Sequence, residues 1–371
     1  MRRLDGAELT LSRRALNRAL LARQLLLERQ SLPALDAIER VAGLQSQASS
    51  PPFVGLWTRL RGFHVAQLQE LIDRREVVRA TLMRHTIHMV SARDYIWLRP
   101  SIQPALDAGF GAQTRKRLAG FDIQPFLDDA RAAFKQRPLT FAEVSQLIEE
   151  RDPDCDVRAI AYAVRTYLRL AGVPNESRWR FGGRAPFVHA EDWLGRPIPD
   201  VGDARQMVRR YLAAFGPATP ADATAWSGVP GMRPVFESLR DELNTFRDEN
   251  GRELFDVPGA PLPPEDAPAP PRLLPDFDNT LLGHRDRTRV IADEHRPRIR
   301  LVGGRLSGSL LLDGFAAALW KVERKRNQAT LLFEPFRRIT NAERSAIEPE
   351  AEALLAFGEP DATATAIRFG R

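Results

Sequence analysis

Apolar positions in the first third of the chain recur at the spacing of amphipathic helices. The leucines at positions 9, 11, 16, 20, 21, 25 and 27 follow a helical period, with arginines on the opposite face. Helices are therefore expected over residues 9–29, 33–41, 53–60 and 65–73. The loop of residues 43–52 cannot be helical throughout, because a residue that precedes proline is pushed toward extended backbone. The alternation over residues 86–90 predicts a strand.

Two later segments share one order of elements, in which helices precede short strands. In the first, three helices are expected. One covers 124–136, the next begins at a capping box formed by Thr140 and Glu143, and the third covers 157–171. Extended pieces at 178–181 and 185–189 would then form a hairpin around a Gly-Gly turn. In the second, helices over 203–215, 219–228 and 232–247 precede a strand at 254–257. This order is typical of winged helix-turn-helix units.

The last part of the chain has a different pattern. The proline-rich residues 258–271 predict a linker or an extended crossing, followed by a β-meander over 299–334 and a terminal helix over 341–357. The predicted fold class is α+β, mainly helical, with tandem winged helix-turn-helix units and a C-terminal β-rich part. The expected domains are a winged-helix-like domain with the loop at 43–52 over residues 1–120 and a second winged-helix domain over 121–200. A third winged-helix domain with the proline-rich linker over 201–271 and a β-rich domain over 272–371 follow.

Composition excludes several classes of protein. With 371 residues, 43% apolar and 27% charged, the chain has ordinary globular composition, and no apolar run reaches the ~18 residues of a membrane helix. The single cysteine, Cys155, excludes an intrachain disulfide and a cysteine zinc cage. The first residues lack the pattern of a secretion signal, so a cytoplasmic protein without membrane contact is expected.

The charge balance points weakly to a polyanionic partner. Lys and Arg total 54 against 48 Asp and Glu, which gives a formal net charge of +6. Only four of the basic residues are lysine, and the chain is also rich in alanine and proline, so part of the arginine surplus reflects GC-rich codon usage.

Two polar stretches are candidate contacts for such a partner. Residues 79–88, taken as one extended chain, would project Arg84, Thr86 and His88 from one side, although a solvated strand face explains the alternation as well. His284, Arg285 and Arg287 lie in a hydrophilic stretch whose guanidinium groups could clamp phosphates. A surface loop with local ion pairs explains this second stretch equally well.

Four stretches share an order and spacing that are specific in combination. They are residues 43–47, 81–90, 210–228 and 273–289. Together they resemble the winged-helix DNA glycosylase family typified by AlkZ and YcaQ, and the resemblance covers about residues 9–358. It implies tandem winged helices that form a concave body on double-stranded DNA. It also implies excision of alkylated purines, including the unhooking of interstrand crosslinks, by a monomer associated with the nucleoid.

The resemblance assigns catalysis to Gln45 and Gln47. The family motif is Gln-x-Gln or Gln-x-Asp, and residues 45–47 match the first form, although Ser46 stands where an apolar residue is usual. A glutamine amide cannot act as a general base near neutral pH, but its oxygen and nitrogen can fix the position of a water. Such help suffices for an N7- or N3-alkylated purine, whose positive charge weakens the glycosidic bond. Monofunctional hydrolysis with no metal and no cofactor is therefore expected, with Arg84 and His88 near the lesion.

Other interpretations stay open from the sequence. Without the resemblance, Gln45 and Gln47 are loop glutamines that cap neighbouring backbone groups. A non-catalytic winged-helix regulator that binds duplex DNA and a protein-binding scaffold are the alternative functions. Affinity for duplex DNA separates the scaffold from the other two, and release of free base separates the glycosylase from the regulator.

Overall fold

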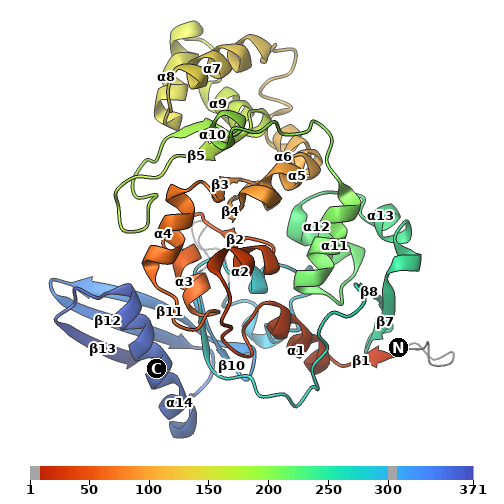
Figure 1. Ribbon diagram of the computed structural model, residues 1–371, viewed down its shortest axis with the longest axis vertical. Helices are drawn as coiled ribbons and strands as arrows, with labels where there is room; N and C mark the ends of the chain where they lie inside the picture. The colour runs from red at the N-terminus through yellow and green to blue at the C-terminus, as the bar shows by residue number, and fades with distance from the viewer. Residues whose placement is uncertain (1–8, 300–306, 371) are drawn as a thin grey trace.

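The chain folds as an α+β protein, as the sequence predicts. The computed structural model describes residues 9–299 and 307–370, in which helices alternate with small sheets, and the sheet that contains β12 and β13 lies at the edge of the molecule beside α14 (Figure 1). Helices α7 (Gln124–Gln136) and α8 (Phe141–Arg151) lie at one end of the long axis, and α14 (Asn341–Gly358) lies at the other (Figure 1). Within the described ranges, no helix has the length and apolar character needed to cross a bilayer.

The N-terminal part is built on an antiparallel sheet of order β2-β4-β3. Its strands are β2 (Leu44–Gln45), β3 (Val77–Thr81) and β4 (Ile87–Ser91). The helices of this part are α1 (Arg13–Arg23), α2 (Ala34–Arg40), α3 (Pro51–Trp57), α4 (Val65–Asp73), α5 (Ala92–Ser101) and α6 (Gln103–Thr114). Helix α1 ends at Arg23 rather than at residue 29, because Leu25 adopts left-handed backbone with φ of 58° and the chain turns there.

Strands β3 and β4 form a hairpin, which corrects the expectation of one extended segment over residues 79–88. The 3₁₀ turn η1 (Met83–His85) interrupts the segment, and Arg84 within it has φ of 55°. Arg84 therefore lies in the turn and does not share a strand face with Thr86 and His88. A polar and apolar alternation cannot distinguish a continuous strand from two strands joined by a tight turn.

The second part contains α7, α8, α9 (Val157–Tyr167), β5 (Leu170–Gly172), β6 (Phe187–His189) and α10 (Ala190–Leu194). The predicted capping box is confirmed, because the Glu143 N–H donates to Oγ1 of Thr140 at 3.3 Å and the Thr140 N–H donates to the Glu143 carboxylate at 2.8 Å. The predicted hairpin is wrong in its first strand. Residues 178–181 form no strand, whereas 170–172, where the predicted helix was to end at 171, form β5 and pair with β6.

The third part contains α11 (Ala204–Phe215), α12 (Pro220–Ser227), α13 (Arg233–Glu237) and η2 (Arg240–Glu242). Strands β7 (Asn244–Asp248) and β8 (Glu253–Asp256) follow. The helix predicted over 232–247 is wrong beyond residue 237, because β7 pairs with β8 on one side and with β1 (Thr10–Leu11) on the other. Backbone partners from the start of the chain thus stabilise a strand where local pattern favours a helix.

The C-terminal part is a sheet of order β13-β12-β11-β10-β9. Its strands are β9 (Arg272–Leu274), β10 (Gly308–Leu312), β11 (Phe315–Lys325), β12 (Gln328–Pro335) and β13 (Ala364–Phe369), and the turns η3 (Asn279–Leu281) and η4 (Asp293–His295) precede β10. The meander is confirmed over 308–335, and residues 300–306 of that prediction lie outside the described ranges. The terminal helix is confirmed as α14. Strand β13, which pairs in parallel with β12, was not predicted.

The core that surrounds β3 and β4 draws on distant parts of the chain. One buried cluster includes Leu20 of α1, Val78 of β3, Tyr211 of α11 and Leu274 of β9. Helices α7–α9 instead enclose a separate cluster with Phe134 and Val164. The position of the loop after β2 is therefore determined by packing between elements from the beginning, middle and end of the sequence.

Candidate active site

The Gln-x-Gln loop begins on β2 and is held against β4. Gln45 lies opposite His88 in the antiparallel ladder, and the Ser46 N–H donates to the Ile87 carbonyl at 2.7 Å. Gly43 precedes the strand with φ of 88°, and a Cβ there would lie 2.6 Å from a side-chain atom of β4. Both the backbone conformation and the close approach of β4 therefore require glycine at this position.

Each glutamine amide has its oxygen engaged by a donor. Gln45 is 6% exposed and accepts through Oε1 from Nη2 of Arg84 at 2.9 Å. Gln47 is exposed and accepts through Oε1 from the Ile87 N–H at 3.1 Å. Because guanidinium and backbone N–H groups only donate, these partners determine which end of each amide is the oxygen. Each oxygen keeps a second lone pair, and each NH₂ group can donate to a ligand.

Arg84 connects Gln45 to two other segments. Its Nη1 donates to the Trp226 carbonyl at 2.7 Å, and its Nη2 donates to Oδ1 of Asn279 at 2.8 Å. Burial, followed by the nearby charge of Arg287, lowers the pKa of Arg84 to about 10. The guanidinium is thus still charged at neutral pH, and its charge is spread over oxygen acceptors.

His88 supports Arg84 as a neutral imidazole. Its buried ring places Nδ1 at 3.2 Å from the Thr86 carbonyl oxygen and Nε2 at 3.3 Å from Nη2 of Arg84. Since Arg84 can only donate, Nε2 accepts and Nδ1 carries the proton. Burial, and then the charge of Arg84, lowers the pKa of His88 to about 3. The Thr86 hydroxyl donates to the Met83 carbonyl at 3.0 Å and so stabilises the turn.

Asn279 is a site residue whose role was not predicted from the sequence. Its side chain is 4% exposed, and Nδ2 donates to the Gly43 carbonyl at 3.2 Å while Oδ1 accepts from Arg84. One buried amide therefore connects the glutamine loop to the hairpin turn. The sequence signal that could have identified Asn279 was its place in residues 273–289, one of the four stretches that carry the family resemblance.

A buried ion pair fixes the position of Asn279. The preceding residue, Asp278, accepts two hydrogen bonds from Arg59, each at 2.9 Å, and both side chains are 1% exposed. Burial alone would raise the pKa of Asp278, but attraction to Arg59 and hydrogen bonds from Arg59 and Thr280 lower it overall. Asp278 is therefore ionised, and its pairing holds the turn that carries Asn279.

Arg79 of β3 holds the middle of the glutamine loop. Its Nε donates to both the carbonyl oxygen and the hydroxyl of Ser46, at 3.2 Å each, and its Cζ lies 5.1 Å from the centroid of the Phe181 ring. The serine at the middle position therefore has a polar partner in the interior. This contact explains how the loop accommodates a residue that is not apolar.

The family of the chain follows from comparison with known proteins. The sequence profile described as DNA glycosylase AlkZ-like matches residues 38–357, which include every residue of the site described above. The chain belongs to the AlkZ-like DNA glycosylase family. The family predicted from the sequence is thus confirmed, and with it a role in DNA binding and repair.

One solved structure supports the fold of this AlkZ-like chain. The Streptomyces sahachiroi DNA glycosylase AlkZ is similar with a TM-score of 0.78 at 20% sequence identity, over 98% of this chain and 100% of that one. No curated protein sequence matches the chain.

In this AlkZ-like protein, the stretch of residues 284–289 divides between core and surface. His284 is 2% exposed, its Nε2 lies 3.0 Å from the Phe215 carbonyl oxygen, and burial, followed by the charge of Arg289, lowers its pKa to about 3. A DNA contact does not fit this enclosed ring, which corrects the expectation for His284. Arg285 is exposed and Arg287 is half-buried, so these two arginines stay candidates for phosphate contact.

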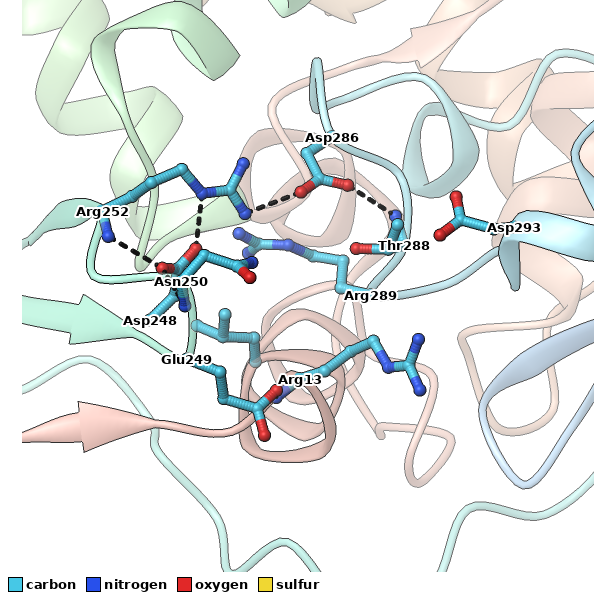
Figure 2. A pocket seen from close by; sticks show the side chains of 10 residues that line it. Arg13, Asp248, Glu249, Asn250, Arg252, Asp286, Thr288, Arg289 and Asp293 are labelled. Carbon is cyan, nitrogen blue, oxygen red and sulfur yellow. Dashed lines mark hydrogen bonds and ion pairs between the residues drawn. The ribbon is translucent and has the colours of Figure 1, made fainter.

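A cavity of about 370 Å³ lies apart from the glutamines, between α1, the β7–β8 turn and residues 286–293 (Figure 2). Arg252 within it contacts Asp248 and Asp286 at 2.6 Å each. The lining also includes Arg13 and Arg289 together with Glu249 and Asp293. Because carboxylates balance the arginines, this cavity does not offer the surplus positive charge that DNA phosphates need.

Over the part of the chain that the structure describes, no group of three or more His, Cys, Asp and Glu side chains could hold a metal ion.

Proposed function

We propose that the chain hydrolyses the N-glycosidic bond of N7- or N3-alkylated purines in DNA, with Gln45 and Gln47 positioning the attacking water. The observation that carries this proposal is the pair of amides at the start of the loop. Arg84 holds the buried amide of Gln45, and the amide of Gln47 is exposed and bound at its oxygen to β4. Two fixed amides beside an accessible surface suit the orientation of a small ligand.

Neutral amides fit a reaction in which the leaving group is already activated. Alkylation at N7 or N3 places a positive charge on the purine, and cleavage of its bond to C1′ releases a neutral base with the bonding electron pair. Water adds to C1′, and its proton passes to solvent. The free lone pair on Oε1 of Gln47 can accept a hydrogen bond from that water and so orient its oxygen. A general base is not required for this step.

Double-stranded DNA is the proposed partner, held by tandem winged helices. Helices α7–α9 followed by β5 and β6, and helices α11–α13 followed by β7 and β8, each have the element order of a winged helix. We retain residues 1–120, 121–200, 201–271 and 272–371 as the proposed units. Arg285 and Arg287 are proposed to contact phosphates.

Unhooking of interstrand crosslinks is part of the same proposal. A glycosylase that encloses its flipped base in a tight pocket excludes a base that is still joined to the other strand. Gln47 is exposed and its loop lies at the surface after β2, which supports access for a bulky adduct.

Base release under single-turnover conditions tests the proposal. Purified protein in excess is mixed with a duplex that contains one N7-methylguanine, and free base is measured over time. Gln47→Ala should slow release by ~10² or more, about 2.7 kcal/mol of barrier, with unchanged duplex affinity. Gln136→Ala is the matched control, because Gln136 is also exposed but lies on α7.

The outcomes separate catalysis from binding. Equal rates for Gln47→Ala and Gln136→Ala would exclude Gln47 from catalysis. If the wild-type protein binds duplex DNA but releases no base from N7-methylguanine or N3-methyladenine, the glycosylase function is wrong and a DNA-binding regulator takes its place.

A further inference from the structure

A cleft without acidic residues lies beside the Gln-x-Gln loop. It has a volume of about 530 Å³ and is bordered by β3, β4, the start of α8, α9 and residues 183–187. Ile87, whose N–H binds Gln47, is one of its lining residues, so the cleft adjoins that glutamine. Arg79, Arg165 and Arg184 line it, and the described lining contains no Asp or Glu.

Two of these arginines are withdrawn from solvent without a carboxylate partner. Arg79 is 8% exposed and donates to Ser46. Arg165 is half-buried, donates through Nε to Oγ1 of Thr81 at 3.0 Å, and places Cζ 5.9 Å from the ring centroid of Phe141. Burial lowers the pKa of Arg79 to about 10, with a contribution from Arg165, and burial also lowers the pKa of Arg165. The hydroxyl, carbonyl and ring partners carry no charge to offset the two guanidinium groups.

Two other buried arginines of the chain, Arg23 and Arg59, are each neutralised by a carboxylate. Arg23 forms two hydrogen bonds to Asp256, at 2.6 and 2.7 Å, with side-chain exposures of 0% and 2%. Arg59 pairs in the same way with Asp278. A desolvated charge without a counterion is costly, and an anionic ligand that enters the cleft would remove that cost.

We propose that this cleft binds the phosphodiester backbone of the DNA strand next to the lesion. Arg165 and Arg184 donate to phosphate oxygens, and Arg79 adds positive charge while it holds Ser46. This inference rests on the proposed function, because it assigns a segment of the substrate to the same site. A strand of DNA fits better than a single small anion, because the three arginines belong to β3, α9 and the segment before β6 around a cleft of 530 Å³.

The phosphate contacts would also place the lesion. A strand anchored on Arg165 and Arg184 passes the side of the loop at which Ile87 holds Gln47. The anchored backbone then limits the position of the neighbouring C1′ relative to that amide, which is the orientation that hydrolysis needs.

Salt-dependent binding tests this assignment. The probe is a duplex with a central tetrahydrofuran abasic-site analogue, and its Kd is measured by fluorescence anisotropy from about 50 to 200 mM salt. R165Q/R184Q should weaken binding about tenfold at low salt and reduce the log–log slope by roughly 2, because each lost phosphate contact removes about 0.9 from it. The matched control is R205Q/R209Q, which removes the same charge from two arginines whose side chains are 43% and 41% exposed and pair with Glu242. The control should keep the wild-type slope.

A single variant keeps the test decisive if Arg165 is needed for folding. Arg184 is exposed, and R184Q alone should reduce the slope by roughly 1 with unchanged circular dichroism. If folded R165Q/R184Q and R184Q both keep the wild-type slope, the cleft does not bind the DNA backbone. If the wild-type protein also releases base normally, that result would overturn only this inference. If the variants lose the salt slope but the wild-type protein releases no base, the glycosylase function is overturned and the cleft stays a DNA contact.

Discussion

Replacing Arg59 by methionine should destabilise the protein mainly through the charge that it leaves behind. Arg59 and Asp278 are each 1% exposed and share two hydrogen bonds of 2.9 Å. Methionine fills much of the space of the arginine stem but leaves the carboxylate of Asp278 buried without a cation. The neighbouring Asn279 would lose the support that positions it between Gly43 and Arg84.

The expected loss is about 3–5 kcal/mol in the free energy of unfolding, the usual cost of breaking a buried ion pair from one side. Arg59 also donates to the carbonyls of Gln24 and Gly55 at 3.0 Å each, so the substitution leaves these acceptors unsatisfied as well. A loss of this size is a large part of the 5–15 kcal/mol that is typical of folded proteins.

The pH dependence of stability should change sign. In the wild type the folded pKa of Asp278 lies below its unfolded value of about 3.9, so this stabilisation is complete above that value and is lost as the pH falls through the folded pKa. In Arg59→Met, burial acts without the cation and raises the folded pKa. The folded variant then holds a proton that the unfolded chain releases, so its stability falls by up to ~1.4 kcal/mol per pH unit as pH rises from about 4 to the raised pKa.

Urea unfolding followed by tryptophan fluorescence, from about pH 4 to pH 7, measures both effects. The double variant Arg59→Met/Asp278→Asn is the control, because it removes the stranded charge. It should regain part of the lost stability and should not show the abnormal pH dependence. A loss below about 1 kcal/mol would show that the ion pair contributes no more than an exposed pair does. Stability of Arg59→Met that still rises with pH in the acid range would show that Asp278 is not left as a stranded buried charge.

Three other outcomes follow from the site. Gly43→Ala should slow base release at least ~10-fold with little change in duplex affinity, because the new Cβ displaces β4 or the glutamine loop; normal release would contradict the geometry of the loop. Arg285→Gln/Arg287→Gln should reduce the salt slope of duplex binding by roughly 2, and an unchanged slope would place these residues outside the DNA contact. The ratio of wild-type to His88→Gln release rates should be constant between about pH 5 and pH 8, because the pKa of His88 is about 3, and a step in that ratio near pH 6.5 would show that the ring titrates during the reaction.

Elements whose ends are encoded by neighbouring residues can be predicted from local sequence. The helix after Thr140 and the helix after Thr340 each begin with a capping box, in which donors and acceptors lie within three residues of each other. Their boundaries are therefore predictable without any knowledge of the fold. The Gln-x-Gln motif could also be recognised in the sequence, because it is short and its neighbours occur in a recognisable order, and the catalytic role of the two glutamines stays a prediction.

Elements and contacts that depend on distant partners are instead set by the packing of the whole fold. Residues 244–248 follow a helical pattern, yet they form a strand because residues 10–11 and 253–256 supply backbone partners. Asn279 meets Gly43 across 236 positions and Arg84 across 195, and Arg79 meets Ser46 across 33. No local pattern encodes such contacts, since each depends on the packing of several elements at once. The same packing withdrew His284 from the surface and left Arg165 without a carboxylate.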